Sequence, residues 1–422
     1  MLQQATKLSL ALAMLGLGVG QVQASGFALI EQSGSGLGNA FAGGAASAED
    51  ASTIFFNPAG MSRLSGQQLT VAANLIRPST NFAGTTTGLA IAGTNPGGDA
   101  GKWAMTPNFY WASELNAQTR VGVGINVPFG LETNYSPTWM GRFQAVASRL
   151  QTVNINPAVS YQVNERLSLG AGLNYQRVDG TLSSAVRYGP ALEGTSTVSG
   201  RDAAWGYNLG LLFQASPQTR LGAAYRSRIK YNLSGSVAFA NRPAGLALAV
   251  PDGAVSLVVS MPDSLSFSVF HQLDERWEIM ADATWTGWSV FKELRVLRAN
   301  GATLSLTPEN WRDTWRIAAG ATYHYSPQWL ARVGVAFDQS PVSDPYRTVR
   351  IPDADRTWLS VGGQYSLSKD SALDVGYAHL FVKNATFNQN PTINTDLFGK
   401  GFLSGYSSNS VDILSVQYRH NF

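Results

Sequence analysis

The sequence predicts an all-β fold: a transmembrane antiparallel β-barrel of about fourteen strands whose lumen is plugged by an N-terminal, partly helical hatch. Three observations predict it. The chain carries little charge, its apolar residues alternate with small polar ones, and short connections alternate with long ones.

Charged residues make up only 14% of the 422 residues, whereas an ordinary soluble domain has roughly 25%. Beyond the N-terminus no apolar run approaches the ~18 residues that a spanning helix requires. The low charge therefore does not come from membrane helices. The formal net charge of +3 is too small to indicate a nucleic-acid partner. The absence of cysteine fits an exported protein without disulfides, and equally fits many cytosolic chains.

Residues 1–24 have the pattern of a secretory signal peptide. Lys7 precedes an apolar stretch over residues 8–19, and the small-residue pattern of a cleavage site comes next at residues 22–24. We expect this segment to be removed on export, which would place the mature N-terminus at Ser25.

From about Gln67 onward the sequence has period two. In residues 167–175, for example, leucine, alanine and tyrosine alternate with serine, glycine and asparagine. Such alternation gives a strand two different faces. It does not by itself distinguish a soluble sandwich from a membrane barrel.

The connection lengths make that distinction. Short polar connections at intervals along the chain are separated by longer loops rich in glycine, proline and asparagine, such as residues 240–253 and 383–410. The short ones are residues 113–118, 163–166, 216–218, 274–276, 326–328 and 368–371. Short turns at one end and long loops at the other are typical of outer-membrane barrels, and strands counted around these turns number about fourteen. Aromatic residues near the turns predict a membrane-interface girdle: Trp111, Tyr161, Trp277, Tyr325 and Trp329.

Residues 25–66 differ from the strand-forming remainder of the chain. They are rich in glycine and alanine and lack the strand period. Asn57 is suited to cap a short helix that begins at Pro58, a position where the missing N–H costs nothing. We therefore expect a compact hatch over residues 25–66 and a barrel over residues 67–422.

Several motifs, taken in order, resemble the FadL/TodX family, the outer-membrane transporters of long-chain fatty acids and other hydrophobic compounds. The terminal Phe422 shares a strand face with Leu414, Val416 and Tyr418, which resembles the assembly signal of outer-membrane barrels. The motifs are SGFALIEQSGSGLGNAFAGGAASAEDAS at 25–52, NPA at 57–59, GINVPFGLETNY at 124–135, TVNINPAVSYQVNERLSLGAG at 152–172, MPDSLSF at 261–267, TWTGWS at 284–289 and IPDADRTWLSVG at 351–362.

This resemblance implies a passive transporter without enzymatic activity, cofactor or metal, acting as a monomer in the outer membrane of a Gram-negative bacterium. Its partners would be membrane lipid and a hydrophobic ligand, with long-chain fatty acids expected first. The ligand would be caught among the extracellular loops and pass a pocket closed by the mature N-terminus. It would then leave sideways through a gap at a kink in the third strand.

The resemblance also assigns residues. The hatch motif is Asn57, Pro58 and Ala59, and Phe27 is the apolar residue nearest the pocket. The kink falls at Asn126, Pro128, Phe129 and Gly130. Proline has no N–H to give to a ladder, so pairing should fail locally.

Each assignment has a simpler alternative. Pro128 would equally end its strand at the extracellular rim, and Asn57 would be a helix cap alone. Arg226, Arg228 and Lys230 are expected to alternate on an inward face, where they would hold a fatty carboxylate or be ordinary charges of a polar lumen.

Asp353 and Asp355 lie two residues apart and would suit a metal site or an acid pair. The resemblance instead makes them residues between a loop and a strand, paired with Arg356. None of the four histidines has metal-ligand spacing.

Three other functions are weighed against fatty-acid uptake. Uptake of aromatic or alkane hydrocarbons would use the same mechanism. An outer-membrane lipid hydrolase would need a serine and a histidine at one level on neighbouring strands, and would leave the hatch unexplained. A general porin would need an open lumen, which the hatch contradicts.

Overall fold

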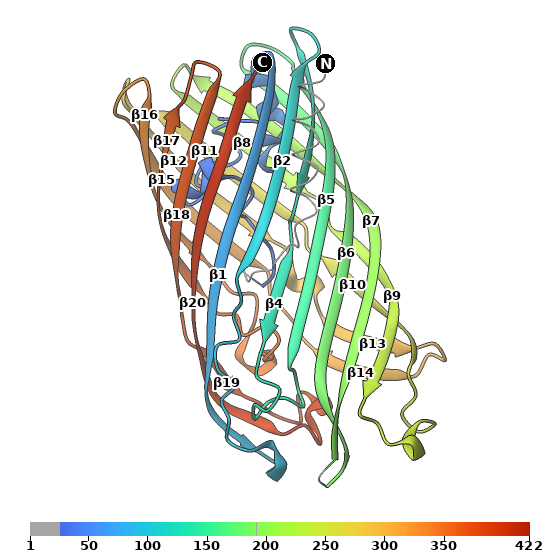
Figure 1. Cartoon of the computed structure of the whole chain (residues 1–422). Helices are drawn as coiled ribbons and strands as arrows, with labels where there is room; N and C mark the ends of the chain where they lie inside the picture. The colour runs from blue at the N-terminus through green and yellow to red at the C-terminus, as the bar shows by residue number, and fades with distance from the viewer. Residues whose placement is uncertain (1–25, 191) are drawn as a thin grey trace.

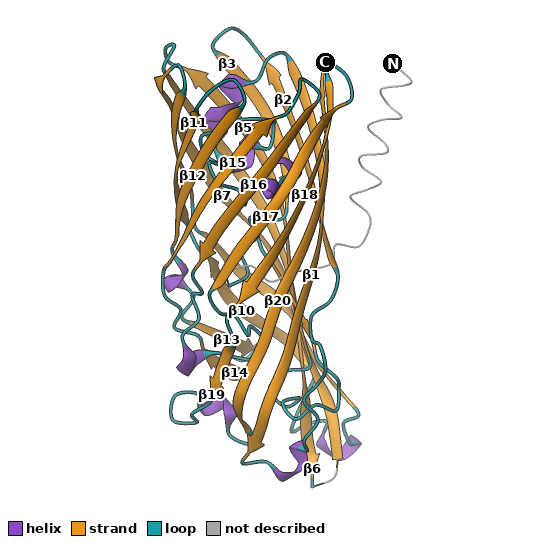
Figure 2. Cartoon of the chain, turned by 90° about the vertical axis from the view of Figure 1, so that its left-hand side faces the viewer, coloured by secondary structure: helices purple, strands orange, loops and turns teal. Residues whose placement is uncertain are grey.

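The computed structural model describes residues 26–190 and 192–422. The predicted signal peptide and Ser25 lie outside the described residues. The chain folds into a closed antiparallel barrel with short helices inside it (Figures 1 and 2). Twenty strand segments form one sheet and make up fourteen passes, so the predicted barrel is confirmed. Within the described ranges, no helix is both long and apolar enough to cross a membrane.

The first half of the barrel runs through β1 (Gln67–Thr87), β2 (Ala104–Glu114), β3 (Thr119–Asn126), β4 (Gly130–Asn134), β5 (Ala147–Gln162), β6 (Leu167–Gly189), β7 (Leu192–Ser216), β8 (Thr219–Arg226), β9 (Ile229–Ala240) and β10 (Gly253–Met261). The second half comprises β11 (Ser264–Gln272), β12 (Trp277–Thr286), β13 (Glu293–Arg298), β14 (Thr303–Pro308), β15 (Thr314–His324), β16 (Trp329–Asp338), β17 (Arg356–Ser366), β18 (Ser371–Val382), β19 (Ala385–Asn388) and β20 (Phe402–Asn421).

The first and last strands close the barrel. β1 pairs with β20 without interruption from Gln68↔Asn421 to Thr87↔Phe402. Because the two strands are antiparallel, the start of β1 and the end of β20 lie at the same end of the barrel, the end of the short turns (Figure 1). The long loops and the 3-10 helices η2 (Ala90–Ala92), η3 (Ala244–Leu246) and η6 (Thr395–Leu397) lie at the opposite end.

The apolar side chains lie on the outer face of the wall near the short turns and on the inner face nearer the long loops. On β6, near the short turns, Leu169 and Leu173 are exposed while Ser168 and Asn174 are buried. On β9 the alternation is reversed, with Tyr231 and Leu233 buried and Lys230 and Asn232 exposed. The wall therefore has an apolar outside where it meets lipid, and an apolar inside in the half nearer the long loops.

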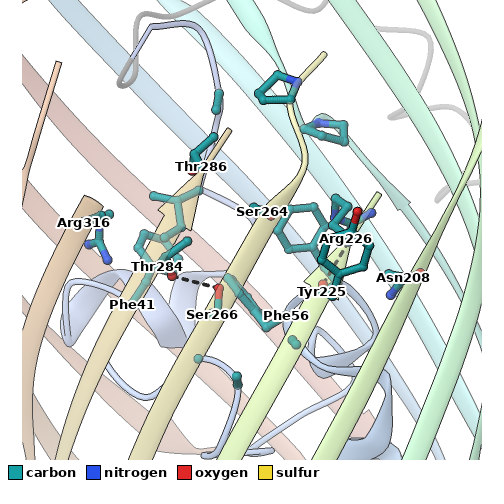
Figure 3. Close-up of a pocket in the computed structure, with 18 of the residues that line it drawn as sticks. Phe41, Phe56, Asn208, Tyr225, Arg226, Ser264, Ser266, Thr284, Thr286 and Arg316 are labelled. Atoms are coloured by element: carbon teal, nitrogen blue, oxygen red, sulfur yellow. Dashed lines mark hydrogen bonds between the residues drawn. The ribbon is translucent and has the colours of Figure 1, made fainter. Parts of the chain in front are cut away.

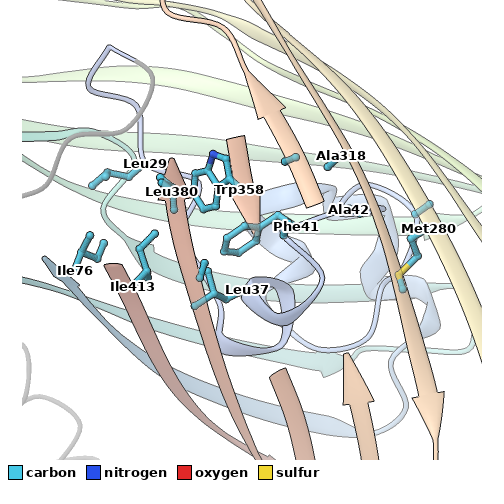
Figure 4. Close-up of a cluster of buried hydrophobic side chains, with 14 of the residues drawn as sticks. Leu29, Leu37, Phe41, Ala42, Ile76, Met280, Ala318, Trp358, Leu380 and Ile413 are labelled. Atoms are coloured by element: carbon cyan, nitrogen blue, oxygen red, sulfur yellow. The ribbon is translucent and has the colours of Figure 1, made fainter. Parts of the chain in front are cut away.

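Residues 26–66 fold inside the barrel, and we call them the hatch. The hatch contains the helices α2 (Gly34–Gly38) and α3 (Thr53–Phe56) and the 3-10 helix η1 (Pro58–Arg63). Leu37 and Phe41 of the hatch belong to one buried cluster with Trp358, Leu380 and Ile413 of the wall (Figure 4). The expectation of a partly helical plug in the lumen is confirmed.

The hatch approaches the wall closely because glycines face it. A Cβ atom on Gly210 would lie 1.9 Å from the Asn57 side-chain oxygen, and one on Gly170 would lie 2.2 Å from the Ala59 nitrogen. Ion pairs fix the opposite side: Arg332 contacts Asp374 at 2.7 Å and also pairs with Glu49 of the hatch. Glycine on the inward face of the strands therefore makes room for the hatch.

Candidate functional site

The third pass of the barrel is broken between β3 and β4. β5 pairs with both segments, but the ladder between β2 and β3 ends at Phe109↔Ile125. Among the described residues, β4 pairs with β5 alone, and residues 104–108 of β2 pair only with β1. The wall therefore has an interruption beside Pro128.

The start of the hatch covers this interruption from inside. The Leu29 N–H donates to the Pro128 carbonyl at 2.8 Å, and the Gly130 N–H donates to the Phe27 carbonyl at 2.9 Å. Ala28 and Phe129 form an isolated antiparallel bridge. The N-terminal segment, residues 26–32, thus satisfies backbone groups that the broken ladder would leave unpaired, which is costly in an apolar surrounding.

The other edge of the break is held by β5. The Phe129 N–H donates to the Thr152 hydroxyl at 2.9 Å, and the Asn154 amide donates to the Asn126 side-chain oxygen at 3.1 Å. The kink residues are therefore fixed on one side by the wall and on the other by the N-terminal segment.

Two cavities lie on either side of the N-terminal segment. The outer cavity, of about 90 Å³, is lined mainly by apolar side chains, among them Phe27, Leu131, Leu233 and Met261. The inner cavity, of about 150 Å³, lies between the hatch and the wall. Its lining includes Pro128 at the break. Figure 3 shows Phe56 of the hatch and Arg226 and Arg316 of the strands around this cavity.

Five aromatic rings separate the two cavities, and we call them the aromatic partition. The Phe27 ring centre lies 4.7 Å from that of Trp288, 5.5 Å from Trp311, 5.7 Å from Phe291 and 6.1 Å from Phe129. Phe27 and Phe291 line the outer cavity, whereas Phe129 and Trp288 line the inner one. A shift of the Phe27 side chain would therefore change the barrier between them.

Asp353 holds the start of the N-terminal segment. Its Oδ2 accepts hydrogen bonds from the Gly26 N–H at 3.0 Å and from the Ser340 hydroxyl at 2.7 Å. The predicted pairing of Asp353 with Arg356 is confirmed, since Arg356 contacts the Oδ1 atom. Asp355 instead pairs with Lys383 and Arg312. The contact of Asp353 with the N-terminus was missed, because 327 residues separate Asp353 from Gly26.

Asn57 has the geometry of a cap and also bridges the hatch to the wall. Its Oδ1 accepts from the Ala59 N–H at 3.1 Å, with Pro58 at the start of η1. Its Nδ2 donates to the Ala45 carbonyl at 2.6 Å and to the Leu211 carbonyl of β7 at 2.9 Å. One buried amide therefore ties together two parts of the hatch and one strand.

The prediction that Arg226, Arg228 and Lys230 share an inward face is wrong for two of them. Arg226 faces the lumen and lines the inner cavity, but Arg228 and Lys230 are exposed. β8 ends at Arg226 and β9 begins at Ile229, so the chain resumes its alternation with Ile229 and Tyr231 inward. The break between the strands changed which residues face the lumen.

Arg226 is already engaged by the protein. Its Nη1 donates to Asn174 at 2.6 Å and its Nη2 to the Phe55 carbonyl at 2.9 Å, and its guanidinium lies over the Phe55 ring. A second buried arginine of the same cavity, Arg316, was not singled out from the sequence. The only sequence signal for an inward Arg316 was its period-two spacing from Thr314 and Ala318, which places the three residues on one face of the strand.

Within the described ranges, no group of three or more histidine, aspartate or glutamate residues could hold a metal ion. The site therefore consists of two cavities, an aromatic partition and a covered wall interruption. This arrangement suits the passage of a molecule.

Comparisons with known proteins agree with this geometry. Residues 16–422 match the family described as outer membrane protein transport protein (OMPP1/FadL/TodX). The long-chain fatty acid transport protein of Escherichia coli K12 is 30% identical over 444 aligned positions, which cover 96% of this chain and 98% of that protein. The 47 kDa outer membrane protein of Pasteurella multocida is 32% identical, with 98% of each covered.

Solved structures show the same fold. A crystal structure of a Pseudomonas aeruginosa FadL homologue superposes with a TM-score of 0.87 at 28% identity, covering 94% of this chain and 100% of that one. The Pseudomonas putida toluene transporter TodX, at 19% identity, superposes with a TM-score of 0.71 over 94% of this chain and 100% of that one, and shows the likeness of fold alone.

Proposed function

We propose that this chain, which belongs to the OMPP1/FadL/TodX family of outer-membrane transport proteins, takes up long-chain fatty acids and releases them sideways through the interruption in its wall. The family membership makes the chain an outer-membrane transport protein of a Gram-negative bacterium, and not an enzyme. The named substrate of the E. coli relative supports fatty acids as the first candidate. We further propose that the protein works as a monomer within the lipid of the membrane, without a cofactor.

One observation supports the route above all others: the inner cavity is bounded by the aromatic partition on one side and by Pro128 of the interrupted wall on another. The aromatic partition therefore separates a ligand in this cavity from the outer cavity, and the covered wall interruption separates it from the membrane. The N-terminal segment takes part in both barriers, through Phe27 and through the Leu29 contact with Pro128.

The transport cycle then has three steps. A hydrophobic tail enters the apolar outer cavity from the side of the long loops, where burial of apolar surface favours it. Displacement of the N-terminal segment moves Phe27 and joins the two cavities. The same displacement removes Leu29 from Pro128 and uncovers the wall, so that the ligand moves down its gradient into the bilayer.

Uptake of aromatic or alkane hydrocarbons is the second candidate. The outer cavity is lined largely by apolar groups, so it would accept such a ligand equally well. The two candidates share the route, and only the fatty acid carries a carboxylate head.

The first test is a titration of the purified, detergent-solubilised protein with oleate, repeated with toluene as competitor. Saturable binding of oleate that toluene does not displace is the expected result. Preferential binding of toluene would indicate that the substrates are hydrocarbons and would leave the proposed route unchanged. Large steady conductance in a planar bilayer would contradict a plugged transporter altogether.

The second test locks the N-terminal segment. The chain has no cysteine, so the double variant Ala28→Cys/Phe129→Cys places a single disulfide across the bridge between these residues. Residues directly opposite in an antiparallel pair have Cβ atoms about 4.5–5.5 Å apart, close enough for a disulfide after slight adjustment. We expect the oxidised protein to stop transporting oleate and the reduced protein to recover. Phe129→Cys alone is the control, and transport by the oxidised form would exclude the proposed movement.

A further inference from the structure

The inner cavity is amphipathic. Its hatch side is apolar, with Leu29, Phe41 and Phe56 among the lining residues. Its strand side carries hydroxyl groups, which come from Ser264, Ser266, Thr284, Thr286 and Thr314. Figure 3 shows Thr284 and Ser266 hydrogen-bonded to each other across neighbouring strands. The outer cavity is lined mainly by apolar side chains, but Arg149, Glu309 and Arg350 also belong to its lining.

Arg316 lies on the polar side of this cavity with unused donors. Its side chain is buried, with 6% of the residue exposed, and it sits opposite Thr284 in the ladder of β12 and β15. The Nη2 atom donates to the Ala40 carbonyl at 2.5 Å. Among the described residues, its Nε and Nη1 atoms have no hydrogen-bond partner. A buried guanidinium whose N–H groups have no protein acceptor is costly, because hydrogen bonds do not offset the desolvation of those groups.

Two of the three acids near Arg316 already have partners within the protein. Asp282 accepts hydrogen bonds from the Ser268 and Thr284 hydroxyls at 2.6 and 3.0 Å. Asp338, opposite Arg316 in the next ladder, also has an interaction partner within the protein. Glu31 of the N-terminal segment is the third acid near this guanidinium, and Arg356 is a second cation near it. Among the described residues, neither carboxylate oxygen of Glu31 has a hydrogen-bond partner. Within the described residues none of these acids is hydrogen-bonded to the Nε or Nη1 atom of Arg316, so both donors can serve a ligand.

Arg226 in the same cavity differs in this respect. Both of its terminal nitrogens donate to protein oxygens. Each of the two guanidiniums lies over an aromatic ring, Arg226 over Phe55 and Arg316 over Trp358. Arg226 contributes positive charge to the cavity, but its donors are committed to the hatch and to β6.

We infer that the inner cavity is a head-group site in which Arg316 binds the carboxylate of the transported lipid, an inference that rests on the proposed function. Arg316 offers the N–H donors, and the neighbouring hydroxyls complete the polar surroundings. The tail lies against the apolar hatch side. A ligand without an oxygen acceptor would leave the guanidinium unpaired, so this cavity selects amphiphiles with an acidic head over bare hydrocarbons.

The test compares ligands that share a tail and differ in the head. The affinities of oleate, oleyl alcohol and toluene are measured for the wild-type protein and for Arg316→Met, which keeps an unbranched apolar stem. Hydrogen bonds to charged groups correspond to roughly 10- to 100-fold in affinity. We expect the wild type to prefer oleate over oleyl alcohol by at least about tenfold. Arg316→Met should abolish this preference by weakening oleate alone.

Two further variants keep the test decisive. Arg316→Lys retains the charge and should retain part of the preference, even if Arg316→Met folds poorly. Arg228→Gln removes an exposed arginine outside the lumen and should leave all three affinities unchanged.

The outcomes separate this inference from the proposed function. Equal binding of oleate and oleyl alcohol by a wild-type protein that still transports oleate would overturn the head-group site and leave the function in place. An equal loss of both ligands in Arg316→Met would also overturn it, because it would reveal a structural role. Binding of toluene without oleate would instead refute the proposed function.

Discussion

The Leu29 N–H donates to the Pro128 carbonyl at 2.8 Å, so the first residues of the hatch serve as the missing neighbour of an interrupted strand. This contact joins the N-terminal segment, residues 26–32, to the interruption in the wall. A movement of the N-terminal segment therefore changes the contacts at Pro128, and a movement at Pro128 changes those of the N-terminal segment.

Prolines lie on both edges of the interruption. Continuing the register of β2 and β3 beyond Phe109↔Ile125 would bring Pro107 opposite Val127, next to Pro128. Because proline lacks an N–H, replacing Pro128 alone leaves the other edge unable to pair fully. We expect Pro107→Val/Pro128→Val to extend the ladder and to lower oleate uptake at least about tenfold.

A refined structure and an uptake assay check this prediction. Pro157→Val is the matched control, since Pro157 lies opposite Val123 within the β3–β5 ladder, which continues on both sides of this pair. A closed wall with unchanged uptake would remove the interruption from the transport route.

Loss of the Asp353 carboxylate should free the N-terminal segment. Asp353→Ala removes the acceptor of the Gly26 N–H, whose hydrogen bond to a charged group is worth about 2 kcal/mol. We expect faster hydrogen exchange over residues 27–32 and a change in the fluorescence of Trp288 and Trp311. Asp355→Ala is the control, because Asp355 contacts exposed Lys383 and not the hatch. Unchanged exchange in Asp353→Ala would show that the aromatic contacts of Phe27 suffice to hold the segment.

Asn57→Ala should loosen the hatch without unfolding the barrel. The variant removes one cap and two hydrogen bonds to the Ala45 and Leu211 carbonyls. Buried acceptors without partners make this cost about 3 kcal/mol. Limited proteolysis within residues 26–66 should accelerate, while the thermal transition of the strands, monitored by circular dichroism, should change little. A matching loss of barrel stability would contradict an effect confined to the hatch.

Glu31 gives the N-terminal segment a dependence on pH. Its side chain is buried, and within the described part of the chain neither carboxylate oxygen has a hydrogen-bond partner. Burial raises the pKa of Glu31 from 4.5 to about 7, although nearby Arg356 and Arg316 oppose the shift. The folded segment therefore favours the protonated acid. Its stability is greatest below pH 4.5 and decreases by roughly 3 kcal/mol as the pH rises through 7.

Hydrogen exchange over residues 28–32, corrected for the intrinsic effect of pH, measures this dependence. Protection should be lower at pH 8 than at pH 5 in the wild type. Glu31→Gln stays neutral and should show equal protection at both values. The same decrease in Glu31→Gln would assign the effect to another group.

Much of the fold is predictable from properties that are local in the sequence. Period-two alternation, short polar turns and low charge each arise from neighbouring residues, because a strand has two faces and a barrel in lipid exposes only one of them to hydrocarbon. The lack of that period and the abundance of small residues likewise marked residues 25–66 as something other than a strand. Pro128 was recognised as a break because proline cannot donate to any ladder.

The candidate site depends on contacts that no local pattern encodes. Gly26 and Asp353 are separated by 327 residues and meet only when the hatch lies in the closed barrel. Arg228 and Lys230 point outward because the strand is broken after Arg226. The pairing of β9, and not the two-residue spacing from Arg226, decides which of its residues face the lumen. A plugged barrel could be predicted from the sequence, since the required periodicity is short-range. The position of Arg316 in the inner cavity, with two donors unpaired among the described residues, follows from the complete fold, because burial and hydrogen bonding depend on every element that surrounds the side chain.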